Sequence, residues 1–298
     1  MSLLVLLAVC SVAWRTGLVG AAFATRRAGP RAASPDSRAG AANTPHGNAL
    51  SRPAGGSTSS RGVASPSADA QAAAVLHFAR LGLPIYCGGG RGNYVALTFD
   101  DGPAAYTPRA VEMLKAAGDT ATFFIVGKQL EYWGTDAVKE EASFGVVGDH
   151  TWNHVDLTRL SPYERQTEIV RTQQRLASIS GRPVVLFRPP LAGYNSELDQ
   201  QVQSLGLLQI IWTVDSKDSA GASPAETLDN VKAGLRPGAI ILMHENRGST
   251  LMDLPAILQA VSAAGLQTVT VPQLLALDPP SDKQVRDSAA VRSCVPAR

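Results

Sequence analysis

Two adjacent carboxylates follow an apolar run in this sequence, where the stretch "TFDDGP" holds Asp100 and Asp101 before Gly102 and Pro103. Aspartate and glycine are common in turns because of their backbone preferences, but a turn gives no reason for the second aspartate. A metal site gives one: one carboxylate binds the cation, while its neighbour stays ionised beside the positive charge and takes a proton from a water.

Two histidines supply nitrogen ligands for such a site. "HTWNH" places His150 and His154 four residues apart, so both imidazoles lie on one side of a helical turn or compact loop. Two imidazoles and one carboxylate leave positions open for water and substrate, as in catalytic zinc centres. We therefore predict one divalent metal ion, with Zn²⁺ as the first choice and Co²⁺, Mn²⁺ or Fe²⁺ as alternatives.

A third histidine and an arginine complete the set of candidate catalytic residues. His244 directly follows the apolar run "AIILM", and we interpret it as a proton donor because a base already stands among the other candidates. An aspartate beside the imidazole would raise its pKa, and Asp215 and Asp218 are both candidates for that partner. Arg188, in "FRPP", is expected to orient Asp100 through a forked ion pair.

The elements that must position these residues are short apolar segments, which alternate with longer segments that carry helix start and stop signals. Strands are expected at 94–99, 121–126, 144–147, 184–187, 208–214, 239–243 and 266–271. Capping boxes, "SPYE" at 161–164 and "SPAE" at 223–226, predict two helix starts. Thr107, as N-cap before Pro108, predicts a third.

This alternation predicts an α/β fold with a parallel sheet covered by helices, either as a barrel or as an open doubly wound sheet. No glycine-rich phosphate loop follows the first strand, which disfavours a dinucleotide-binding fold. The candidate catalytic residues all follow predicted strands. In a barrel the carboxyl ends of the strands form one face, so these residues would converge there.

The N-terminal region differs in composition from the rest of the 298-residue chain. An apolar run and a small-residue pattern at 22–24 predict a secretory signal peptide at 1–24, with an uncleaved anchor as the alternative. Residues 25–70 are rich in alanine, serine, glycine, proline and arginine and predict a disordered basic linker, which could contact an anionic cell wall. The net charge of +2 gives no reason to expect a nucleic-acid partner.

We assign residues 71–93 to a lead-in segment, 94–277 to a single catalytic domain and 278–298 to a C-terminal tail. Cys87 and Cys294 bracket that domain. The two ends of a barrel come close together, and a secreted protein is oxidised, so we predict a disulfide between them.

Five segments in order resemble the motifs of one known family: "TFDDGP" (98–103), "HTWNH" (150–154), "FRPP" (187–190), "WTVDSKD" (212–218) and "ILMH" (241–244). Together they are similar to the polysaccharide deacetylases of carbohydrate esterase family 4, the NodB homology domain, over roughly residues 94–277. The resemblance implies a deformed (β/α)7-type barrel and metal-dependent removal of N- or O-acetyl groups from glycans such as chitin oligomers, peptidoglycan or xylan.

The resemblance also implies a role for individual residues. By its motifs, Asp100 is the catalytic base, His244 the catalytic acid, and the backbone N–H of Leu191 an oxyanion donor. The metal ligands implied are Asp101, His150 and His154.

The sequence departs from the family at two positions. The family usually has tyrosine where this chain has Leu191, and tryptophan where it has Ser219. A backbone N–H survives the first change, but aromatic surface on which sugar rings stack is lost. Tyr194 or Trp212 would have to compensate, although Trp212 lies inside a predicted strand and fits the core better.

Three alternative functions follow from the same residues. A hydrolase of small non-sugar amides would tolerate Leu191 and Ser219 in place of the family's aromatic residues, because it would not need to bind a sugar ring. A catalytically weak glycan-binding protein would be expected to lack a ligand or the base, and none is missing. A non-haem iron oxygenase would use two histidines and one carboxylate, but it leaves the second aspartate and His244 without roles. We therefore expect a monomeric enzyme whose partner is an acetylated glycan.

Overall fold

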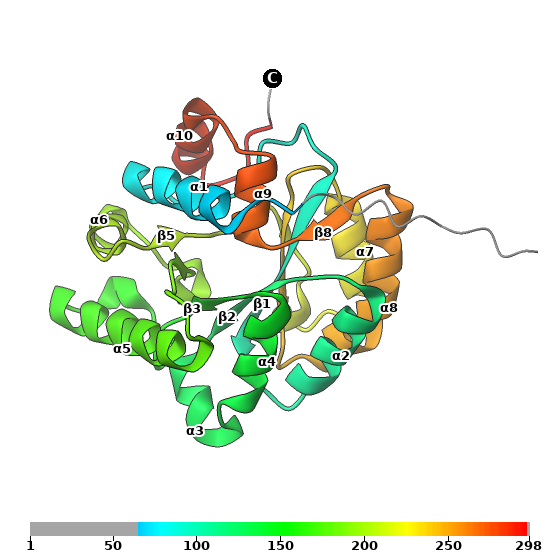
Figure 1. The fold of residues 1–298 in the computed structure, drawn as a ribbon, viewed down its shortest axis with the longest axis horizontal. Helices are drawn as coiled ribbons and strands as arrows, with labels where there is room; N and C mark the ends of the chain where they lie inside the picture. Colours follow the sequence, from blue (N-terminus) through cyan, green and yellow to red (C-terminus); the bar gives the residue numbers. More distant parts are fainter. Residues whose placement is uncertain (1–64, 297–298) are drawn as a thin grey trace, which may run out of the picture. The chain divides into compact units, whose positions relative to one another are not determined.

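The sheet is built around one long strand, β1 (Tyr94–Gly102), in a computed structural model that describes residues 65–296. This strand pairs in parallel with β2 (Thr122–Ile125) on one side and β7 (Ile240–His244) on the other (Figure 1). Its apolar residues are buried on both faces, which explains the near-continuous apolar run. The predicted signal peptide and most of the predicted linker lie outside the described residues.

The remaining strands extend this sheet in the spatial order β5-β4-β3-β2-β1-β7-β6, and β8 pairs with the first residues of β1. Their bounds are β3 (Val146–Asp149), β4 (Leu186–Phe187), β5 (Leu208–Gln209), β6 (Val214–Asp215) and β8 (Gln267–Val269). All the ladders are parallel. The sheet curls into an incomplete barrel, which confirms the predicted deformed (β/α) barrel.

The single strand expected at 208–214 is wrong, because this segment forms two strands of two residues each, one at either end of the sheet. The N–H of Ile210 donates to the carbonyl oxygen of Phe187 in β4 while Ile210 also pairs with Ile85, and the N–H of Thr213 already donates to the carbonyl oxygen of Ile240, the first residue of β7. Cys87 pairs in turn with Ala239. The segment before β1 therefore fills the gap between the two ends of the sheet.

Helices surround the curled sheet (Figure 1). Their bounds are α1 (Ala68–Leu81), α2 (Thr107–Ala117), α3 (Leu130–Trp133), α4 (Asp136–Phe144), α5 (Pro162–Ser180), α6 (Ser196–Ser204), α7 (Pro224–Gly234), α8 (Gly248–Ala263), α9 (Val271–Leu277) and α10 (Asp282–Val291). Both predicted capping boxes are confirmed at the starts of α5 and α7. Across residues 65–296, no helix combines the length and the apolarity that crossing a membrane requires.

Thr107 is not the N-cap that the sequence predicted. Tyr106 precedes α2 in that position without a side-chain cap, and the Thr107 side chain is buried. Its hydroxyl accepts a hydrogen bond from the N–H of Ala104 and donates to the carboxylate of Glu245. The hydroxyl is therefore used to hold the turn after β1.

The two ends of the described chain contain helices that the sequence did not predict. Residues 68–70, assigned to the linker, begin α1, and the predicted tail contains α10. Helices α1 and α9 pack together (Figure 1), and Nε2 of His77 on α1 lies within hydrogen-bond distance, 2.8 Å, of Oδ1 of Asp282 on α10. The predicted disulfide between Cys87 and Cys294 is confirmed.

The side chains of β1 alternate between two faces of the sheet, and only one of these faces carries residues of the candidate site at its carboxyl end. Val95, Leu97 and Phe99 pack into a cluster with residues of α2, α7 and α8, whereas Ala96 belongs to a second cluster with residues of α1 and α9. Because side chains in a strand alternate between faces, Thr98 and Asp100 share the face of Ala96. The strand thus presents Asp100 to the interior of the barrel at its carboxyl end.

Candidate metal centre and active site

The two aspartates near the carboxyl end of β1 both reach the mouth of the barrel. Adjacent residues of a regular strand would point to opposite faces, but Asp101 has φ of 69°, in the left-handed region. Nε2 of His150 lies 3.6 Å from Oδ2 of Asp100 and 3.8 Å from Oδ1 of Asp101. The bend of the backbone after Asp100 thus brings both carboxylates to one imidazole.

Asp101, His150 and His154 form a cluster whose potential ligand atoms all lie within 4.8 Å of one another. Nε2 of His154 is 3.2 Å from Oδ1 of Asp101. Nδ1 of His150 donates to the carbonyl oxygen of Arg188 at 2.7 Å, which leaves the Nε2 lone pair facing the cluster. Burial lowers the pKa of His150 and so favours its neutral, metal-binding form.

The cluster fits a divalent cation. Oδ1 of Asp101 is buried and has no hydrogen-bond partner among residues 65–296, although it faces two imidazole nitrogens. An orphaned buried carboxylate oxygen is costly unless a cation or a proton satisfies it. Two imidazoles and one carboxylate are a ligand set that zinc accepts in catalytic sites.

Asp100 is held by a fully buried arginine. Nη1 of Arg188 donates to Oδ1 of Asp100 at 2.7 Å and to the hydroxyl oxygen of Thr98 at 2.8 Å. The expected forked pair is wrong, since only one guanidinium nitrogen contacts the carboxylate. Nε and Nη2 donate instead to the carbonyl oxygens of Ile210 and Ile211, each at 3.2 Å, where the chain crosses from β5 to β6.

His244 at the end of β7 contacts Asp218 and not Asp215. Nδ1 of His244 and Oδ1 of Asp218 are 2.7 Å apart. Asp218 also accepts hydrogen bonds from the backbone N–H groups of Ser219 and His244 and from the hydroxyl of Thr250. Asp215 is bound to Nζ of Lys217 at 2.8 Å. Of the two aspartates that the sequence offered as partners of His244, Asp218 is therefore the one that contacts it.

The environment of His244 favours its protonated form. Burial by itself lowers the pKa of the imidazole, but the hydrogen bond that it donates to Asp218 and the negative charges of Asp100, Asp218 and Asp101 raise it above its usual value. Burial would raise the pKa of Asp218, but its hydrogen bonds with His244 and Thr250 lower it overall. The pair is therefore arranged as an imidazolium beside a carboxylate.

Leu191 lies in a short 3-10 turn (Pro190–Ala192), where its φ of 59° is left-handed. Its side chain points to solvent and is 73 % exposed. Among residues 65–296 its N–H donates no hydrogen bond. The backbone donor that the resemblance implies is thus available, and no aromatic side chain stands at this position.

Tyr194 does not offer a surface for a sugar, so this expectation is wrong. Its ring is 9 % exposed, its hydroxyl bonds to that of Tyr86, and the guanidinium of Arg292 lies 4.0 Å from the ring centre. Trp212 is partly buried between two core clusters, and the guanidinium carbon of Arg188 is 5.7 Å from its ring centre. The position of Trp212 thus agrees with the prediction that this side chain packs in the core.

Several features of the site were not predicted from the sequence. Six non-glycine residues in the motif segments or directly after one of them have a positive φ: Asp101, Thr151, His154, Leu191, Ala192 and Lys217. Such conformations cost free energy and concentrate at functional sites. The segment after His244 was also missed. A Cβ atom on Gly102 would lie 2.1 Å from Oε1 of Glu245, so a side chain at this position would displace the buried Glu245 carboxylate.

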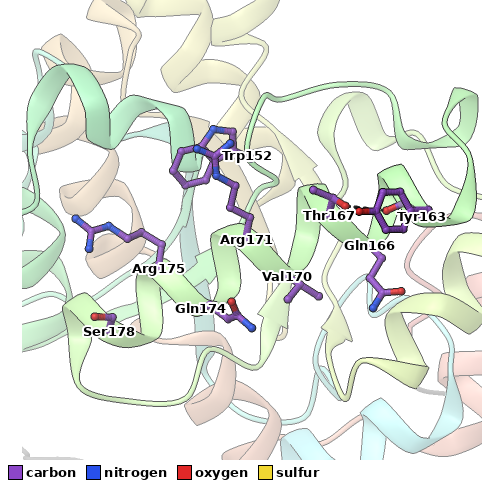
Figure 2. Close-up of a pocket in the computed structure, with 9 residues that line it drawn as sticks. All are labelled: Trp152, Tyr163, Gln166, Thr167, Val170, Arg171, Gln174, Arg175 and Ser178. Atoms are coloured by element: carbon purple, nitrogen blue, oxygen red, sulfur yellow. Dashed lines mark hydrogen bonds between the residues drawn. The ribbon is translucent and has the colours of Figure 1, made fainter.

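A shallow hollow of about 710 Å³ runs along the outer face of α5 (Figure 2). Trp152, from the loop between His150 and His154, is the one lining residue outside that helix. The guanidinium carbon of Arg171 lies 3.5 Å from the Trp152 ring centre, with Tyr163 toward one end of the hollow and Arg175 toward the other. Because Arg171 covers the indole, Trp152 offers no open ring face here.

Comparison with known proteins gives consistent matches. The polysaccharide deacetylase family model matches residues 88–210. The peptidoglycan-N-acetylglucosamine deacetylase of Listeria monocytogenes is 34 % identical over 60 % of this chain and 38 % of its own length. That of Bacillus cereus is 32 % identical over 60 % of this chain and 67 % of its own length. The solved structure of a family 4 carbohydrate esterase from Streptomyces lividans in complex with acetate has a TM-score of 0.58 and 34 % identity, and the match covers 61 % of this chain and 95 % of that one.

Proposed function

Because this chain belongs to the polysaccharide deacetylase family, we propose that it is a metal-dependent hydrolase that removes acetyl groups from a polysaccharide. The observation that carries the proposal is the meeting of three units at one mouth of the barrel. These are the Asp100–Arg188 pair, the cluster of Asp101, His150 and His154, and the His244–Asp218 pair. A base, a metal site and an acid together can carry out amide or ester hydrolysis by water.

A divalent cation, with Zn²⁺ as the first choice, would be held by Asp101, His150 and His154, and would polarise the acetyl carbonyl and acidify water. Asp100 would accept the proton of the attacking water, and the hydrogen bond from Arg188 holds its carboxylate in place. The N–H of Leu191 would donate to the oxyanion that develops on the acetyl group. His244 would protonate the departing amine or alkoxide, and acetate is released.

The substrate class proposed is an acetylated cell-wall or plant polysaccharide, with peptidoglycan first and chitin oligomers and xylan next. The names of the Listeria and Bacillus relatives support peptidoglycan as the first choice. We also propose that the protein acts as a monomer outside the cytoplasm, directed there by the predicted N-terminal signal. The Cys87–Cys294 disulfide supports an oxidising compartment, and the basic segment before α1 would favour an anionic cell wall.

Acetate release by the purified full-length chain tests this function. We expect release from peptidoglycan, acetylated chito-oligosaccharides or acetylxylan, complete loss after dialysis against a chelator, and recovery with Zn²⁺ or Co²⁺. A small acetylated amide serves as the comparison substrate. Release from the small amide alone would contradict the glycan assignment, and undiminished release after verified metal removal would contradict the metal-dependent mechanism.

Substituting Asp218 should alter the pH dependence of catalysis. In Asp218→Asn the charge and hydrogen bond that raise the pKa of His244 are weakened, while burial continues to lower it. The protonated acid is then lost at lower pH, so the alkaline limb of the kcat profile should move to lower pH.

The kcat profile from pH 5 to 10 measures this shift, and Asp215→Asn is the matched control in the same motif. Asp215 contacts Lys217 and not His244, so its profile should coincide with that of the unmodified protein. An unchanged alkaline limb in Asp218→Asn would refute the role of the pair.

A further inference from the structure

We propose that Asn246 is a positioning residue for the metal centre, because its side-chain amide fixes one oxygen of Asp101 and so directs the other toward His150 and His154. Nδ2 of Asn246 donates to Oδ2 of Asp101 at 3.1 Å. Oδ1 of the same carboxylate is the buried, unpartnered oxygen that faces the two imidazoles. The two oxygens of Asp101 therefore have separate partners.

The sheet carries Asn246 to this place. His244 is the register partner of Asp100 across β1 and β7, and the N–H of Glu245 continues the ladder to the carbonyl oxygen of Asp100 at 3.0 Å. The buried Glu245 carboxylate accepts the Thr107 hydroxyl, which also holds Ala104 after the turn. The residue before Asn246 and the turn after Asp101 are thus both held by hydrogen bonds.

The chemistry of the contact fixes the orientation of the amide. An ionised carboxylate only accepts hydrogen bonds, so Asn246 must turn its NH₂ group toward Asp101. Without that bond the carboxylate could rotate about its last torsion and present either oxygen to a cation. Partners of ligating carboxylates contribute 10- to 100-fold to metal affinity, roughly, in other proteins.

The inference concerns metal affinity and does not depend on which glycan is deacetylated. We therefore test it by binding, with the metal-stripped full-length chain. Zn²⁺ affinity is measured by competition with a chromophoric chelator, and the coordination of Co²⁺ by its visible absorption. The variants are Asn246→Ala and Asn246→Leu, the second of similar volume, with Arg247→Ala as a control on the exposed neighbour.

Both Asn246 variants should bind Zn²⁺ about 10- to 100-fold more weakly and show an altered Co²⁺ spectrum, while Arg247→Ala matches the unmodified protein. Thermal unfolding of the metal-free proteins separates positioning from folding, and the variants should keep the unmodified midpoint. Zn²⁺ affinity within twofold of the unmodified protein would overturn the proposal. A midpoint lowered in both variants would also overturn it, because Asn246 would then be a structural residue.

Discussion

Asp100→Asn should lose acetate release by a factor of about 10³, within the range that a positioned base contributes. The substitution keeps the shape of the side chain and can still accept from Arg188, but it removes the site that takes the proton from water. Metal binding should survive, since Asp101 and the two histidines remain. The measurement is kcat on the preferred glycan together with Zn²⁺ stoichiometry.

A conservative change elsewhere controls for nonspecific loss. Asp136→Asn alters an exposed carboxylate on α4 that contacts Lys139, and its kcat should be unchanged. If Asp100→Asn kept a tenth of the activity with metal bound, another group would have to be the base. Loss of zinc from Asp100→Asn would instead indicate that Asp100 belongs to the metal site.

Arg188→Met should lower the free energy of unfolding by about 3–5 kcal/mol, the cost of removing one partner from a buried ion pair. The change leaves the Asp100 carboxylate without its cation and the carbonyl oxygens of Ile210 and Ile211 without donors. Arg188→Lys should recover only part of the loss, because a single ammonium cannot replace the planar donors at all three places. Denaturant unfolding of the metal-free proteins measures both.

Arg165→Met is the matched control for a buried arginine. Arg165 is also buried, but its partner Glu197 on α6 is mostly exposed and can be rehydrated. We expect a smaller loss of stability and unchanged acetate release. Equal losses for the two arginines would show that Arg188 acts by packing alone and not through the charge of Asp100.

The positions of the site residues along the chain could be predicted because they depend on local patterns. Apolar runs that end in polar residues mark strand ends, and parallel strands bring those ends to one face. Asp100, His150 and His244 were found in this way, and the helix starts at Ser161 and Ser223 followed from their capping boxes. The α1 helix was missed because its buried face is completed only by partners distant in the sequence, whereas α10 was missed although Ser281 and Gln284 form a capping box at its start.

Where the sequence offered two chemically equivalent candidates for a contact, only the tertiary structure shows which of them makes it. Lys217 has a left-handed φ of 61°, which turns the chain after β6 so that Asp218 and not Asp215 meets His244. The crossing of residues 210–213 between the two ends of the sheet supplies carbonyl oxygens to Arg188 and so prevents a forked pair.

The sequence by itself determined which residue types stand at the strand ends, and therefore the family and the kind of chemistry. Only the tertiary structure decided which oxygen of Asp101 faces the two histidines, which aspartate contacts His244, and that Tyr194 is buried. The physical reason is that these contacts join residues far apart in the chain, through backbone conformations and side-chain rotamers that no local pattern specifies.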